Sequence, residues 1–189
     1  AMFSRNEIYD YDNIVVLLTH LHADHIGSLG SFLSFCKNVL DKKVLLAAEE
    51  DTIVNILDQS GVHTDKYNFT TDFKECEADG LSIYVKRESH ATDMLCCGFI
   101  FECNGEKIYY SGDTSNVPSD ILNAFLSGEI KTMYQECTFL DTDSTSHFSL
   151  KKLCEIIPYE ERQRVYCMHL GDDIEDDIVK AGFRVPKIV

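Results

Sequence analysis

The stretch His20-Leu21-His22-Ala23-Asp24-His25 places three imidazoles and one carboxylate within six residues. It follows an apolar run over residues 14–18 and is soon followed by Gly27. Imidazole nitrogens and carboxylate oxygens are ligands that borderline cations such as Zn²⁺ accept at ~2.0–2.2 Å. The stretch therefore predicts a metal site.

The spacing within this stretch predicts two ions rather than one. If residues 15–19 form a buried strand, His20 and His22 project to the same side, because side-chain direction repeats every two residues along a strand. One cation can then contact both rings. Asp24 and His25 follow where the chain turns toward a helix, and we expect them to face a second ion nearby.

Residues 19–27 resemble the signature of the metallo-β-lactamase superfamily. Three later positions resemble its remaining ligand motifs, and each follows a strand-like apolar run: His90, Asp113 and His169. Strand ends in a layered α/β sheet converge on one edge, so residues distant in sequence can meet there. The resemblance implies one ion held by His20, His22 and His90, a second held by Asp24, His25 and His169, and Asp113 bridging them.

Two further segments resemble the ribonuclease Z branch of this superfamily, in which a glutamate orients a histidine beside the scissile phosphate. They contain Glu136 and His147. A departing alkoxide needs a proton or a positive charge, and a carboxylate-held histidine supplies both. A second interpretation, compatible with the first, places His147 at a helix start capped by Asp143 or Ser144.

The resemblance implies a metal-dependent phosphodiesterase. A water shared by two cations ~3.5–4 Å apart becomes the nucleophile, with Asp24 holding its hydrogen as well as a metal. Zinc is the first expectation, although the same nitrogen and oxygen ligands suit Mn²⁺ and Fe. Two alternatives stay open: a thioesterase or lactamase-type hydrolase of the same fold, and a metal-binding protein without turnover.

The charge of the chain constrains the substrate. With 32 acidic and 17 basic residues, its net charge is −15, and basic residues cluster only in pairs. A nucleic-acid binder usually presents a basic face, so long nucleic acid is disfavoured. Two cations can still recruit one small phosphate against an acidic background, which favours a small nucleotide-like phosphodiester.

Length and hydropathy predict one domain over residues 1–189. A chain of this size with 44% hydrophobic residues can bury a sizeable core. No apolar run approaches the ~20 residues of a membrane span. The eight cysteines form no C-x-x-C pair. We therefore expect reduced, small core residues in a reducing compartment, which predicts a cytoplasmic protein.

The resemblance implies an α/β fold, the αββα sandwich of the superfamily. Only 19 residues precede His20, whereas the opening strands of that family span several dozen residues. We therefore expect part of the N-terminal sheet to be lacking, and a second subunit, as in a homodimer, to cover the open sheet edge.

Apolar periodicity and turn residues predict the individual elements. Asn104-Gly105 is a type I′ turn signal between two alternating strands, which delivers Asp113 to the sheet edge. Expected helices cover residues 28–38, 49–59, 119–126 and 174–181, with another beginning near residue 146; expected strands cover residues 44–47, 81–85, 96–103, 106–110 and 132–135, with a closing strand or tail at 183–186.

Overall fold

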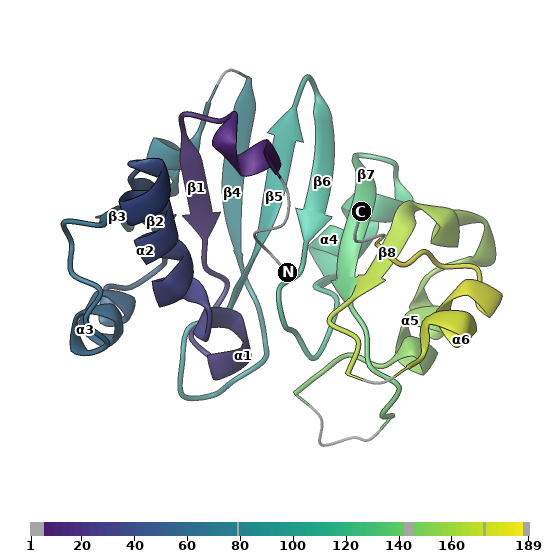
Figure 1. Ribbon diagram of the computed structural model, residues 1–189. Coiled ribbons are helices and arrows are strands. Elements are labelled where there is room, and N and C mark those ends of the chain that lie inside the picture. The colour runs from purple at the N-terminus through teal and green to yellow at the C-terminus, as the bar shows by residue number, and fades with distance from the viewer. Residues whose placement is uncertain (1–5, 79, 142–145, 172, 187–189) are drawn as a thin grey trace. The chain divides into compact units, whose positions relative to one another are not determined.

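The computed structural model describes residues 6–78, 80–141, 146–171 and 173–186 (Figure 1). The chain forms two compact units, Ala1–Cys76 (unit 1) and Glu77–Val189 (unit 2). Both units combine strands with helices, which confirms the α/β class. The assignment of residues 1–189 to one domain stays a prediction.

The described residues of unit 1 form a parallel three-stranded sheet in the order β1-β2-β3. Leu29, Leu33 and Cys36 recur at helical spacing on α2 and are buried with strand residues such as Leu46. With η denoting a 3₁₀ helix, the elements are η1 Asn6–Tyr9, β1 Ile14–Leu17, α1 Ala23–Ile26, α2 Leu29–Leu40, β2 Val44–Ala47, α3 Thr52–Gln59, β3 Tyr67–Thr70 and η2 Phe73–Cys76.

Strand β1 is shorter than the sequence analysis predicts. It ends at Leu17, so His20 and His22 lie in the segment between β1 and α1. The alternation of a strand therefore does not place these two rings, and that part of the prediction is wrong. Strand β3 is not among the strands that the sequence analysis predicts.

Unit 2 is built on a mixed sheet. The described strands have the order β4-β5-β6-β7-β8, antiparallel from β4 to β6 and parallel from β6 to β8. The elements are β4 Leu81–Arg87, β5 Cys97–Cys103, β6 Glu106–Tyr110, α4 Ser119–Leu126, β7 Ile130–Glu136, α5 Leu150–Ile156, η3 Tyr159–Arg164, β8 Val165–Met168 and α6 Glu175–Lys180.

The hairpin that joins β5 to β6 is closed as predicted. Asn104 and Gly105 both have positive φ, 53° and 79°, as a type I′ turn requires. At the other side of the sheet, Arg184 pairs in parallel with Tyr166 of β8. Residues 183–186 therefore contribute a closing strand contact rather than a detached tail.

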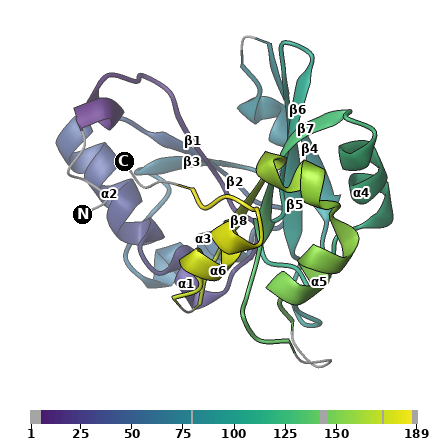
Figure 2. The same cartoon turned by 90° about the vertical axis from the view of Figure 1, so that its right-hand side faces the viewer.

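One face of the unit 2 sheet carries its core. The buried row Tyr109, Met133 and Val165 runs across three neighbouring strands. Residues of α4, α5 and α6, such as Phe125 and Leu153, are buried in the same cluster. Figure 2 shows α4 and α5 beside the strands of this unit.

Strand directions gather the candidate ligands of unit 2. Because β4 is antiparallel to β5 and β5 to β6, strand β4 runs the same way as β6, β7 and β8. The carboxyl ends of these four strands therefore meet at one edge of the sheet. The positions that end or follow them are His90, Asp113, Glu136 and His169.

The helix expected at residue 146 begins later. Helix α5 starts at Leu150, and the Ser149 hydroxyl caps it by accepting a hydrogen bond from the Lys152 N–H at 3.2 Å. His147 is therefore not a helix-start residue. Asp143 and Ser144, the caps that the sequence suggested, lie outside the described residues.

The cysteines are free thiols, and most occupy core positions as expected. Cys103 is exposed because it ends β5 at the hairpin turn, and Cys154 is half-buried, so the core prediction is wrong for Cys103. Among the described residues, none of the helices has the length and apolarity required to span a membrane.

Candidate metal centre

Unit 1 holds a compact group of donors, His20, His22, Asp24 and His25, which we call the unit 1 cluster. His20 Nε2 lies 3.0 Å from His22 Nδ1, and the His20 and His25 ring centroids are 4.1 Å apart. Thr19 Oγ1 lies 3.1 Å from His20 Nδ1. Because Thr19 contacts Nδ1, the other ring nitrogen of His20, Nε2, faces His22. The neighbouring threonine therefore orients a candidate ligand.

Asp24 occupies the first turn of α1 and is exposed. Its Oδ2 lies 3.6 Å from His25 Nε2. Three imidazoles beside one carboxylate form a donor set that suits zinc and similar transition metals. The local chain, rather than a distant contact, brings these four side chains together.

Unit 2 holds a second group, His90, Asp113, Glu136, His147 and His169, which we call the unit 2 cluster. It centres on the buried carboxylate of Asp113. Oδ2 of Asp113 lies 3.7 Å from His90 Nε2, 3.6 Å from His169 Nε2 and 4.0 Å from His147 Nδ1.

These separations exceed hydrogen-bond length but suit ligands around a shared ion. Two donors bound to one tetrahedral Zn²⁺ at ~2.0–2.2 Å lie about 3.3–3.6 Å from each other. Nε2 of His90 and Nε2 of His169, at 3.7 and 3.6 Å from Asp113 Oδ2, are close to that spacing. The residues present in unit 2 therefore fit a divalent metal.

Glu136 is fully buried at the end of β7 and orients two histidines. His147 Nδ1 donates a short hydrogen bond to its Oε1, and His169 Nδ1 lies 3.4 Å from the same oxygen. The pairing holds His147 in the tautomer whose Nε2 can exchange a proton with a substrate. The His147 side chain is 36% exposed, so a ligand can reach it.

His90 is oriented by a backbone carbonyl. Its Nδ1 donates to the oxygen of Ser146 at 2.8 Å, which directs Nε2 toward Asp113. Because Ser146 precedes His147, this bond also ties the segment that carries His147 to His90. No residue pattern could have predicted this bond, since any residue supplies a carbonyl.

His169 occupies an unusual backbone conformation. Its φ is 55°, in the left-handed region that a residue other than glycine rarely adopts. Such a conformation costs about 1–3 kcal/mol and is retained where the surrounding structure requires it. The turn after β8 brings the ring toward Asp113 and Glu136.

Glu88 is a residue of this edge to which the sequence analysis gave no role. It is half-buried, and burial raises its pKa to about 7, against hydrogen bonds from Tyr109 and Thr114 that lower it. The Tyr109 hydroxyl donates to Oε1 at 2.6 Å, and the Thr114 hydroxyl lies 3.2 Å from Oε2. One sequence signal could have identified Glu88. It is an acidic residue that directly follows a strand and precedes a candidate ligand by two positions.

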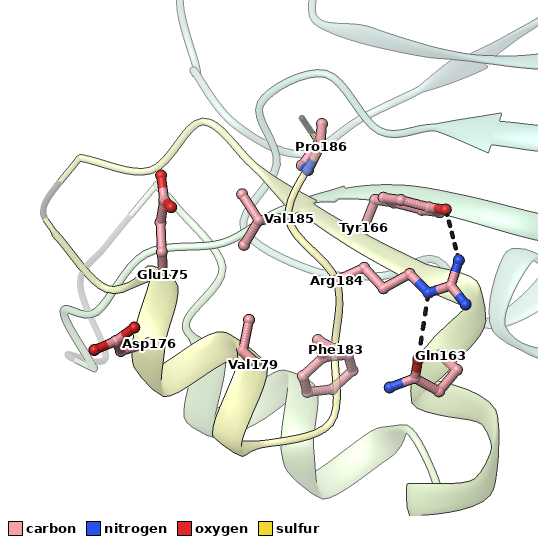
Figure 3. Close-up of a pocket in the computed structure, with 9 residues that line it drawn as sticks. All are labelled: Gln163, Tyr166, Glu175, Asp176, Val179, Phe183, Arg184, Val185 and Pro186. Carbon is pink, nitrogen blue, oxygen red and sulfur yellow. Dashed lines mark hydrogen bonds between the residues drawn. The ribbon is translucent and has the colours of Figure 1, made fainter. Parts of the chain in front are cut away.

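A separate cavity of about 1030 Å³ lies in unit 2, beside β8, α6 and the segment after α6 (Figure 3). Arg184 donates hydrogen bonds to the Tyr166 hydroxyl at 2.9 Å and to Gln163 Oε1 at 3.3 Å. None of the predicted site residues lines this cavity. This cavity is therefore distinct from the candidate metal centre.

Comparison with known proteins gives a family match over nearly the whole chain. The family model described as Anti-Pycsar protein Apyc1 matches residues 4–185. The Anti-Pycsar protein Apyc1 of Bacillus phage BSP38 is 28% identical over 192 aligned positions, covering 88% of this chain and 72% of that protein. The protein of the same name from Paenibacillus harenae is 23% identical over 173 positions, covering 85% of this chain and 69% of that protein.

Solved structures show the same fold at low sequence identity. The metallo-β-lactamase fold protein YhfI from Bacillus subtilis matches with a TM-score of 0.67 at 17% identity, covering 96% of this chain and 78% of that one. A diphosphatase from the PhnP family matches with a TM-score of 0.68 at 18% identity, covering 96% of this chain and 72% of that one. Human tRNase Z, short form, matches with a TM-score of 0.58 at 18% identity, covering 82% of this chain and 72% of that one. The predicted metallo-β-lactamase fold is confirmed, and a tRNase Z is among the structural neighbours.

Proposed function

The chain belongs to the Anti-Pycsar protein Apyc1 family, and from this premise we propose that it is a metal-dependent phosphodiesterase for small nucleotide phosphodiesters. The observation that carries the proposal is the buried Glu136 holding His147 beside the Asp113 carboxylate. This arrangement supplies an acid for a leaving oxygen next to a carboxylate suited to bind cations.

We assign the metal ligands to the residues that the sequence predicts. The donor chemistry of each cluster suits divalent ions, and we propose two of them, zinc first and Mn²⁺ or Fe as alternatives. The proposed ligands are His20, His22, Asp24 and His25 of the unit 1 cluster with His90, Asp113 and His169 of the unit 2 cluster. When bound, the ions supply an acidified water and positive charge beside the phosphate.

His147 is the proposed general acid. In the imidazolium form it donates the Nε2 proton to the oxygen that leaves as the phosphorus–oxygen bond breaks, while water adds to phosphorus and yields a phosphomonoester. Glu136 accepts the Nδ1 hydrogen bond and stabilises the imidazolium charge. Asp24, which is exposed, is the proposed acceptor for the hydrogen of the attacking water.

Charge supports a small substrate. The chain carries a net charge of −15, which opposes the many phosphates of a long nucleic acid. Cyclic mononucleotides are the smallest nucleotide phosphodiesters and carry a single negative charge, so we take them as the first substrates to test. The second subunit expected at a sheet edge stays a prediction that light scattering tests.

The test uses the purified chain, stripped of metal with a chelator and reloaded with Zn²⁺ or Mn²⁺. We expect metal-dependent hydrolysis of bis-p-nitrophenyl phosphate and of at least one cyclic mononucleotide, with the phosphomonoester identified by chromatography. Turnover of a thioester or β-lactam without phosphodiester hydrolysis would establish the alternative hydrolase. Two bound ions per chain without hydrolysis of any ester would identify a metal-binding protein.

A further inference from the structure

Glu88 lies between the two segments that carry His90 and Asp113. It directly follows β4 and precedes His90 by two residues. Its Oε1 accepts a hydrogen bond from the buried Tyr109 hydroxyl at 2.6 Å, and its Oε2 lies 3.2 Å from the hydroxyl of Thr114. Thr114 is the neighbour of Asp113, so one side chain contacts both the end of β6 and the turn after it.

Backbone contacts reinforce the same connection. The Ser115 N–H and hydroxyl both donate to the carbonyl oxygen of Ser89, at 2.6 and 2.7 Å. The Thr114 N–H donates a short hydrogen bond to Glu136 Oε2. Thr114 therefore lies between two carboxylates, Glu88 on one side and Glu136 on the other.

The chemistry of the side chain explains why a carboxylate suits this position. Two hydroxyl groups, of Tyr109 and Thr114, approach Glu88 from different elements. A carboxylate offers an acceptor oxygen to each, whereas a glutamine amide offers one acceptor and one donor. Burying a carboxyl group is unfavourable unless its oxygens are satisfied, so the contacts account for its presence.

We infer that Glu88 is a positioning residue that fixes the His90 and Asp113 segments relative to each other, and so sets the metal affinity of the unit 2 cluster. The inference rests on the proposed function, because it takes His90 and Asp113 as ligands. Glu88 itself hydrogen-bonds to Tyr109 and Thr114. It acts through Thr114, Ser89 and the backbone that carries them.

The experiment compares Glu88→Ala and Glu88→Gln with a matched control, Glu129→Gln. Glu129 is an acidic residue of the same unit whose carboxylate contacts only Lys107 among the described ion pairs, at 2.7 Å. Zn²⁺ and Mn²⁺ affinities are measured by competition with a chromogenic chelator, alongside the melting temperature of each metal-free variant. Partners that orient a metal ligand typically change affinity by about 10–100-fold when removed.

We expect Glu88→Ala to weaken metal binding by about 10–100-fold without changing the number of ions bound, in line with the loss of a ligand-orienting partner. Glu88→Gln, which retains one acceptor, should lose less, and Glu129→Gln should bind as the wild type does. A lower melting temperature with unchanged metal affinity would show a merely structural role and would overturn the inference.

A second measurement separates this inference from the proposed function. If the wild-type chain binds no metal, the proposed function fails. The connection through Glu88 is then judged by amide hydrogen exchange at Thr114 and Ser115 in the metal-free protein. Faster exchange at these amides in Glu88→Ala than in Glu129→Gln supports it, and equal exchange refutes it.

Discussion

The two clusters contain similar donors but are assembled in different ways. The unit 1 cluster lies within six consecutive residues, whereas the unit 2 cluster is drawn from positions between His90 and His169. In unit 1, one connecting segment and the first turn of α1 hold the donors. In unit 2, the ends of the parallel strands hold all of them except His147, which lies in the segment before α5. The contrast shows that local spacing can encode one set of ligands while sheet topology encodes another.

The clusters also differ in charge. Rings of the unit 1 cluster contact each other, and its one carboxylate, Asp24, is exposed. The unit 2 cluster surrounds two buried carboxylates, Asp113 and Glu136. Buried carboxylates among imidazoles favour positive charge at their centre. We therefore expect substitutions of the buried carboxylates to have the largest functional effects.

The largest effect is expected from Asp113→Asn. It keeps the size of the side chain but removes the charge on which His90 and His169 converge. We expect phosphodiester hydrolysis to fall by about 10³-fold, because several kcal/mol of charge stabilisation are lost. Asp58→Asn is the control, since Asp58 is exposed and contacts His63 at 2.6 Å. If Asp113→Asn hydrolyses the substrate at the wild-type rate at saturating metal, the Asp113 carboxylate is not part of the site.

His147→Ala tests the acid in the unit 2 cluster. A general acid contributes about 10²–10⁴-fold, and its contribution grows as the leaving group becomes more basic. We expect the loss to be larger for a cyclic nucleotide, which expels an alkoxide, than for bis-p-nitrophenyl phosphate. His63→Ala is the matched control, because this exposed histidine also contacts a carboxylate. Equal losses on both substrates would assign His147 a role other than proton donation.

The sequence predicted the elements that depend on local signals. Asn104-Gly105 closed the hairpin as expected, and the strand over residues 44–47 and the helix over 119–126 were predicted with correct bounds. The candidate ligands of unit 2 were placed at strand ends because an apolar run precedes each of them. Those predictions rest on chain-local information, which a single sequence contains.

Other features could not be predicted because they depend on distant partners. The carbonyl of Ser146 orients His90 across 56 positions, and Thr114 joins Glu88 to Glu136. The cap of α5 was misplaced because several hydroxyl and carboxylate residues precede that helix, and only the backbone shows that Ser149 accepts the bond. Tertiary contacts, rather than propensity, decide such details.

Gly98→Ala tests how tightly unit 2 packs the strands that lead to Asp113. A Cβ at Gly98 would lie 2.5 Å from the Tyr110 carbonyl oxygen and 2.7 Å from that of Ser111. Because backbone must shift, we expect the free energy of unfolding to fall by about 1–3 kcal/mol. Gly61→Ala in unit 1, where φ is +77° and no atom lies within 4 Å, should cost about 1 kcal/mol. Urea denaturation compares the two, and an equal or smaller loss for Gly98→Ala would contradict the close approach.

The stability of the metal-free protein should also depend on pH. The pKa of Glu88 is raised to about 7 by burial, above its ordinary value of 4.5. Between these two values the folded state binds more protons than the unfolded state, so the free energy of unfolding decreases as pH rises and levels off above the folded-state pKa. This carboxyl group can contribute at most about 1.4 kcal/mol per pH unit.

Glu88→Gln removes this titration, so its stability should change less than that of the wild type between about pH 5 and pH 7. Glu129→Gln should keep the wild-type slope, since the Glu129 carboxylate lies outside the Glu88 contacts. Urea denaturation across this range measures both variants. If Glu88→Gln and wild type share one slope, the half-buried carboxyl is already ionised below this range, and the electrostatic contrast between the clusters rests on Asp113 and Glu136 alone.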